Sequence, residues 1–99
     1  MKTVYLDTET TGLDPDNDEL LEIAIVDDLG KVLIDTLIRP QRRRQWQEAQ
    51  RIHGITPKSV RGAPTLEDML PDVVTAVSGA HLVIYNAAFD LSFLPDAVS

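Results

Sequence analysis

The chain begins with the stretch that decides its fold, VYLDTETTGLD at positions 4–14. The apolar run at its start predicts a first strand over residues 3–7, which leads directly into two carboxylates, Asp7 and Glu9. Side chains two residues apart on a strand lie on the same face. Adjacent carboxylates repel each other and lose hydration, a cost that a bound cation offsets. Because Mg²⁺ prefers oxygen ligands, the pair indicates a divalent metal site.

A simpler interpretation exists for the same residues. Asp-Thr-Glu-Thr-Thr-Gly is typical of a polar turn, in which Gly12 supplies a positive φ angle. Asp7 and Glu9 would then cap a strand and face solvent. On the pair alone this turn is the simpler choice, and a second acidic site further along the chain changes the balance.

Size and composition indicate one ordinary globular domain. The 99 residues are 43% hydrophobic and 25% charged, which is typical of such a domain. The sequence has no cysteine, so disulfides, thiolate metal sites and a cysteine nucleophile are excluded. No run approaches membrane-spanning length, and the N-terminus lacks a signal-peptide pattern. We therefore expect a cytoplasmic protein with no membrane partner.

The net charge of −7 argues against a broad basic surface for nucleic acid. It does not argue against a metal-dependent nuclease, because bound cations reverse the local field at an acidic site.

The first part of the chain predicts an antiparallel meander. After the first strand, apolar residues predict strands over residues 20–26 and 31–38, with a hairpin-type turn over residues 27–30. Helical signals follow: residues 45–53 predict a helix that ends at Gly54. Thr65 is a predicted N-cap for a helix whose apolar spacing continues to Gly79, in which Pro71 predicts a kink or a later start.

The last part predicts a buried strand over residues 81–85 and then a helix from Ala87, which reaches about three turns by Ser99. Phe89, Phe93 and Leu94 are predicted core residues by spacing. The order β-β-β-α-α-β-α predicts an α/β fold with a mixed sheet flanked by helices. A buried strand followed by an unfinished helix suggests a longer parent fold.

The second acidic site is Asp90, which follows Asn86 in the first turns of the last helix. Taken alone, Asp90 is an acid favoured by the helix dipole. However, Asp-x-Glu-Thr-Thr-Gly from Asp7 to Gly12, Asn-x-x-Phe-Asp from Asn86 to Asp90, and the loop His-Gly-Ile-Thr at residues 53–56 occur together. With them the chain resembles the DEDD (DnaQ-like) family of 3′–5′ exonucleases, and within it the proofreading epsilon-subunit group.

The resemblance implies an RNase H-like fold with a parallel fourth strand. It also implies that Asp7, Glu9 and Asp90 are catalytic and bind two Mg²⁺ or Mn²⁺ ions, with Glu9 near the 3′-hydroxyl of a single-stranded DNA or RNA end. The implied product is a nucleoside 5′-monophosphate, formed by two-metal hydrolysis. The implied substrate-binding residues are Thr10, Thr11, Gly12, Leu13 (a wedge against the base) and Asn86.

The chain departs from the family in its third motif, His-x-x-x-x-Asp or Tyr-x-x-x-Asp, which the 99 residues do not contain. Residues 1–99 are therefore expected to be a partial exonuclease domain, C-terminally incomplete, with weakened metal binding and no positioned general base. Neither His53 nor His81 is assigned that role, and Tyr85 stands where the group often has histidine. The alternative is a catalytically inactive module that binds nucleic acid or a protein partner, such as a polymerase or a second copy.

Two further features have open interpretations. Arg39, Arg42, Arg43 and Arg44 are either phosphate contacts or, as we favour, a solvated basic loop. Trp46 either stacks on a base or, as we favour, anchors a helix to the sheet.

Overall fold

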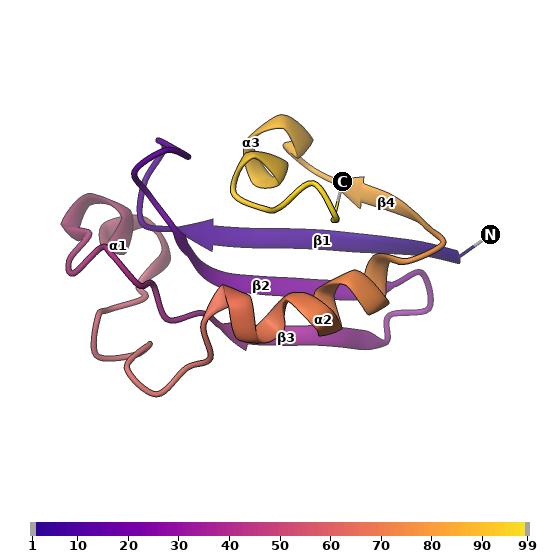
Figure 1. Cartoon of the computed structure of the whole chain (residues 1–99), viewed down its shortest axis with the longest axis horizontal. Helices are drawn as coiled ribbons and strands as arrows, with labels where there is room; N and C mark the ends of the chain where they lie inside the picture. The colour runs from indigo at the N-terminus through magenta and orange to yellow at the C-terminus, as the bar shows by residue number, and fades with distance from the viewer. Residues whose placement is uncertain (1, 99) are drawn as a thin grey trace.

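Four strands form one mixed sheet, in the order β3-β2-β1-β4. The structure is a computed structural model and describes residues 2–98. The strands β1 (Lys2–Thr10), β2 (Leu20–Asp27) and β3 (Val32–Leu37) form an antiparallel meander. The fourth strand, β4 (Ala80–Ile84), lies parallel to β1 (Figure 1). The predicted meander with a parallel fourth strand is confirmed.

The first strand is longer than the sequence predicts. It continues to Thr10, which pairs with Leu20 of β2. Asp7 and Glu9 therefore lie inside a paired strand, and the interpretation of these residues as a turn is wrong. The register shifts between Glu9 and Thr10, and such a bulge changes the direction of the side chains beside it.

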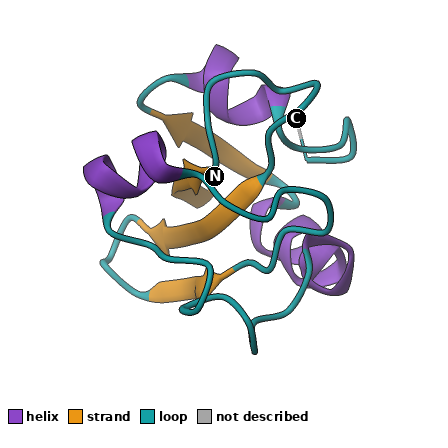
Figure 2. Ribbon diagram, turned by 90° about the vertical axis from the view of Figure 1, so that its left-hand side faces the viewer, coloured by secondary structure: helices purple, strands orange, loops and turns teal. Residues whose placement is uncertain are grey.

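Three helices accompany the sheet: α1 (Gln47–His53), α2 (Leu66–Val77) and α3 (Ala87–Ser92). Figure 2 shows α1 and α2 on opposite sides of the sheet. Gly54 ends α1 with a φ of 76°, as predicted. Thr65 caps α2 through a capping box with Asp68, which confirms the predicted start.

Pro71 lies inside α2 without delaying its start, so the prediction of a later start is wrong. Proline lacks the N–H that would bond the carbonyl four residues earlier, at Glu67. Both residues are exposed, so water can reach this carbonyl. The buried side of α2, at Val73, Ala76 and Val77, and the capping box hold the two halves of the helix together.

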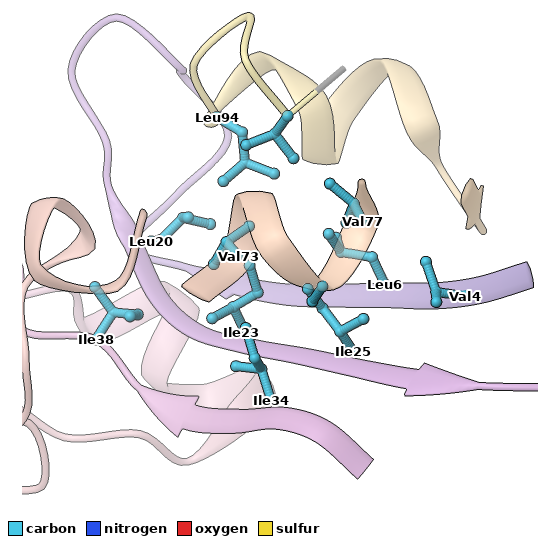
Figure 3. Packing of buried hydrophobic residues seen from close by; sticks show 12 residues of the cluster. Val4, Leu6, Leu20, Ile23, Ile25, Ile34, Ile38, Val73, Val77 and Leu94 are labelled. Atoms are coloured by element: carbon cyan, nitrogen blue, oxygen red, sulfur yellow. The ribbon is translucent and has the colours of Figure 1, made fainter. Parts of the chain in front are cut away.

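The core lies between the sheet and α2. Alternate residues of the strands pack against this helix and the C-terminal segment (Figure 3). Buried members of the cluster include Val4, Leu6, Ile23, Ile25, Ile34, Val73, Val77 and Leu94. A smaller cluster of Leu21, Trp46, Ile55 and Val60 fixes the segment around α1.

Two predictions about the end of the chain are wrong. The strand β4 is half-buried and exposed in alternation, because it lies at the edge of the sheet within residues 2–98. The helix α3 ends at Ser92, since Pro95 follows and disfavours helical backbone in the residue before it. Leu94 is buried as predicted, whereas Phe89 and Phe93 are only half-buried. No helix in residues 2–98 has the length and apolar character needed to cross a membrane.

Candidate functional site

The strand β1 presents different chemistry on its two faces. Val4, Leu6 and Thr8 are buried, and the two aliphatic side chains pack in the core beside α2. Asp7 is exposed and Glu9 half-buried, and the period of two places both on the opposite face. Asp7 and Glu9 therefore share one face, as the strand spacing predicts.

Negative charge concentrates around this pair. Glu22 of β2 lies directly across from Glu9 in the sheet register. Burial raises the pKa of Glu22, and the nearby charges of Asp35, Glu9 and Asp7 raise it further, while His53 lowers it. Because each added proton or cation relieves this repulsion, the face has the electrostatic character of a cation site.

Asp90 does not lie beside Asp7 and Glu9 but contacts Thr8 of the same strand. Its carboxylate is buried (6% exposed) and accepts a hydrogen bond of 2.6 Å from the Thr8 hydroxyl. Thr8 lies between Asp7 and Glu9 in β1, so its side chain leaves the strand on the other face. Within residues 2–98, no group of three or more histidine, aspartate or glutamate side chains is arranged to hold a metal ion. The structure therefore brings Asp7 and Glu9 together but does not add Asp90 to them.

A cleft of about 770 Å³ opens at the end of β1, against α1. This volume is within the range of about 300–1,000 Å³ that is typical of small-ligand pockets. The predicted site residues Glu9, Thr10, Thr11, Gly12 and Leu13 line it, together with Asp14, Asp18, Arg43, Trp46, Ile52, His53 and Phe89.

The predicted substrate-binding residues differ in what they can offer a ligand. Leu13 is 84% exposed at the cleft, and Asn86 is also exposed. The backbone N–H of Thr11 donates to the Glu19 carbonyl over 2.9 Å. That N–H is consequently occupied within the fold, whereas the Leu13 side chain is free to contact a ligand.

The structure gives a different reason for glycine at position 12 from the one that the sequence predicts. The φ of Gly12 is not positive, in contrast to Gly30, Gly54 and Gly79, so the prediction of a positive φ is wrong. A Cβ at residue 12 would lie 2.7 Å from Cγ of Asp18. Glycine therefore leaves room for the Asp18 carboxylate against the backbone, and a side chain here would displace that carboxylate.

Asp18 organises the loop that follows β1. Its carboxylate accepts hydrogen bonds from the Thr11 hydroxyl (2.9 Å) and the Asp14 backbone N–H (3.1 Å). It also pairs with Nε of Arg43 at 3.4 Å. These contacts hold the loop over residues 11–18 against the arginine segment, residues 39–44.

Glu19 fixes the arginine segment itself. Its carboxylate accepts backbone hydrogen bonds from Gln41, Arg42 and Arg43, at 2.9, 2.9 and 2.8 Å. Burial opposes ionisation of Glu19, but these three N–H groups and the Arg42 charge outweigh it and lower its pKa. The basic loop is therefore held in a defined shape.

His53 and Trp46 are both structural in their contacts. Nδ1 of His53 accepts the Ile55 backbone N–H (3.0 Å), so Nε2 carries the hydrogen and donates to the Thr10 carbonyl (3.0 Å). Trp46 is buried, and its ring N–H donates to the Ile55 carbonyl over 2.8 Å. The anchoring interpretation of Trp46 is confirmed, and His53 ties α1 to the end of β1.

Asp18 and Glu19 were not among the residues that sequence reasoning selected. The signal that could have found them is the acidic run Asp16–Glu19, which is complementary in charge to the arginine run at 42–44. This charge complementarity predicts that the two runs lie close together, but it does not predict which residues pair.

Comparisons with known proteins identify the family of the chain. Residues 4–99 match the profile of the exonuclease family (RNase_T). An uncharacterized exonuclease of Escherichia phage 186 is 40% identical over 87 residues, which cover 88% of this chain and 44% of the phage protein. The DNA polymerase III epsilon subunit of Rickettsia conorii is 36% identical over 104 residues, covering 100% of this chain and 45% of that subunit.

The solved structures share the fold. E. coli exonuclease I, crystallised with a dT13 oligonucleotide, superposes with a TM-score of 0.77 at 21% identity, covering 97% of this chain and 23% of that one. Exonuclease I of Methylocaldum szegediense also gives 0.77 at 21% identity, covering 93% and 22%. The mixed sheet with one parallel pair is thus the RNase H-like fold of these enzymes. The chain spans less than half the length of these relatives.

Proposed function

Since this chain belongs to the exonuclease family, we propose that it is a 3′–5′ exonuclease domain acting on single-stranded DNA or RNA ends. Its product is a nucleoside 5′-monophosphate. The observation that carries the proposal is the pair Asp7 and Glu9, which share one face of β1, with Glu9 lining a cleft of about 770 Å³. Residues 1–99 form part of the whole domain, and a polymerase-type protein or a second copy is the proposed protein partner.

The acidic face fits a divalent cation, Mg²⁺ or Mn²⁺. Asp7 and Glu9 are oxygen ligands of the kind that such ions prefer. Burial raises the pKa of Glu22 beside them, and the charges of Asp35, Glu9 and Asp7 raise it further. Asp90 is the proposed third ligand, and its carboxylate accepts the Thr8 hydrogen bond through one of its two oxygens. Asp7 and Glu9, with Asp90, would hold two such ions, which would supply activation of the attacking water and stabilisation of the leaving oxygen.

The side chains around the cleft bind and orient the strand end. Glu9 receives the 3′-hydroxyl, and Leu13, which is free at the cleft, packs against the terminal base. The backbone of Thr10, Thr11 and Gly12 borders this position, although the Thr11 N–H is already bonded within the fold. Asn86, at the start of α3, contacts the nucleotide from the side of β4.

The test is nucleotide release from a single strand labelled on its 3′-terminal nucleotide, in the presence of Mn²⁺, with Asp7→Asn as the matched variant. Loss of a metal-binding carboxylate removes several kcal/mol of charge stabilisation. We expect at least about a hundredfold slower release in Asp7→Asn, which corresponds to about 2.7 kcal/mol. Equal rates in the two proteins would exclude the proposed role of Asp7.

Binding of Mn²⁺ by isothermal calorimetry gives a readout that does not depend on activity. Thr8→Val removes the partner of Asp90 and keeps the shape of the side chain. If Asp90 is a ligand, this variant binds Mn²⁺ at least as tightly as the parent, and Asp90→Asn binds it more weakly. Unchanged binding in Asp90→Asn would exclude Asp90 as a ligand.

One observation favours a second candidate function, an exonuclease-like module that binds without hydrolysis. Asp90 is engaged by Thr8, and residues 2–98 contain no assembled group of three metal-binding side chains. Binding of the labelled strand without any nucleotide release, at millimolar Mn²⁺, would favour this module over the enzyme.

A further inference from the structure

The basic residues of this acidic chain are concentrated in one loop. Four of its nine lysines and arginines are Arg39, Arg42, Arg43 and Arg44, while the net charge is −7. The half-buried Glu19 holds this loop through three backbone N–H groups. Because the Glu19 carboxylate binds mainly backbone, the loop is ordered without neutralising every arginine side chain.

The arginines of this loop face different surroundings. Arg42 pairs with Glu19 (3.8 Å) and lines a separate cavity on the side of Ile38 and Leu66. Arg43 lines the cleft that contains Glu9 and Leu13. The side chain of Arg43 is therefore the cationic one that belongs to the candidate site.

The Arg43 side chain is held in place by Asp18, but part of its guanidinium group remains accessible to a ligand. Its Nε atom lies 3.4 Å from Asp18, and 45% of the side chain remains exposed. Within residues 2–98, neither of its terminal amino groups makes a hydrogen bond to the protein. A guanidinium held at Nε presents its remaining donors in a fixed plane, which suits a phosphate.

We propose that Arg43 binds a backbone phosphate of the single strand, at a nucleotide upstream of the one whose 3′ end reaches Glu9. This inference rests on the proposed function and adds a subsite to it. Glu9, Asp14, Asp18 and Glu48 also line the cleft, so a polyanion entering it meets repulsion that a local cation offsets. Arg44, the next residue in the loop, is also exposed but is not among the residues that line the cleft.

The proposal predicts an effect of strand length. The test is fluorescence anisotropy with Mg²⁺ and nuclease-resistant phosphorothioate strands, a dinucleotide and a decanucleotide, on the full 99-residue chain. Arg43→Gln should weaken decanucleotide binding about three- to tenfold and leave the dinucleotide unchanged. The slope of log affinity against log salt should fall by about 0.7, the value for one phosphate contact on a single strand.

Two variants complete the design. Arg61→Gln makes the same charge change at an exposed arginine outside the cleft, and it should leave both affinities within twofold. Arg43→Lys keeps the charge and should keep the salt slope while losing part of the affinity, which separates phosphate contact from damage to the fold. Equal losses in Arg43→Gln and Arg61→Gln, or equal losses on both strands, would overturn the proposal.

Failure of this proposal is distinguishable from failure of the proposed function. Salt-dependent decanucleotide binding that needs Arg43, without nucleotide release by the parent chain, supports the phosphate contact and rejects the enzyme. Nucleotide release that is unaffected by Arg43→Gln at every strand length supports the enzyme and rejects the phosphate contact.

Discussion

Substituting Gly12 by alanine tests why the first motif requires glycine. The structure predicts that the new Cβ collides with the Asp18 carboxylate, whose Cγ lies 2.7 Å from the ideal Cβ position. The carboxylate must then move away from the loop. Its hydrogen bonds from Thr11 and Asp14 and its ion pair with Arg43 are lost together.

The magnitude follows from these contacts. Hydrogen bonds to charged groups contribute about 1.5–3 kcal/mol each when well buried, but the Asp14 bond is exposed and falls below that range. An ion pair with a half-exposed arginine adds less than about 1 kcal/mol. A gross loss of about 2–4 kcal/mol is offset by up to about 1 kcal/mol, because alanine restricts the unfolded chain. The net loss of about 1–3 kcal/mol lowers Tm by about 5–20 °C in a domain of this size.

Urea unfolding followed by fluorescence of the single, buried Trp46 measures this loss. Gly62→Ala is the matched control, because a Cβ there has no heavy atom within 4 Å and its φ is not positive. In an Asp18→Ala background the collision is absent, so Gly12→Ala should change stability by less than about 0.5 kcal/mol. Equal destabilisation in both backgrounds would refute the collision as the reason for glycine.

Two further predictions concern stability. Glu19→Gln should destabilise the chain at pH 7: the native pKa of Glu19 is lowered despite burial, by the three backbone N–H groups and Arg42. This stabilisation is therefore fully present above its ordinary value of 4.5 and is lost as pH falls through the native pKa, so urea midpoints of parent and variant should converge on acidification. Pro71→Ala should stabilise the chain by about 1–2 kcal/mol, since it restores a helical N–H inside α2, and a lower thermal midpoint would contradict this.

Much of the fold is predictable from local signals. Alternating apolar residues identify the strands, Thr65 marks the start of α2, and Gly54 marks the end of α1. The predictions fail where packing in the folded chain overrides the preference of a single residue. Pro71 is tolerated because it lies on the exposed side of an otherwise buried helix, and the orientation of a helix toward the core is not a property of one residue.

The candidate site is predictable only in part for the same reason. The period of a strand is enough to place Asp7 and Glu9 on one face. No such rule exists for Asp90, because the direction of its side chain depends on the path that connects β4 to α3. The roles of Asp18 and Glu19 likewise depend on contacts with residues 11–14 and 41–43, which bring distant loops together.

The position of Asp90 nevertheless shows how far its carboxylate is from joining Asp7 and Glu9 in one site. Because β4 is parallel to β1, with Ile84 beside Leu6, the carboxyl ends of both strands lie at the same edge of the sheet. Asp90 follows β4 by six residues and already reaches Thr8, which lies directly between Asp7 and Glu9 in the chain. Asp90 is thus at the same end of the sheet as Asp7 and Glu9, and it is separated from them because it contacts the opposite face of β1. Turning the Asp90 carboxylate toward Asp7 and Glu9 puts at most one hydrogen bond to a charged acceptor at stake, about 1.5–3 kcal/mol, because only one of its two oxygens accepts from Thr8.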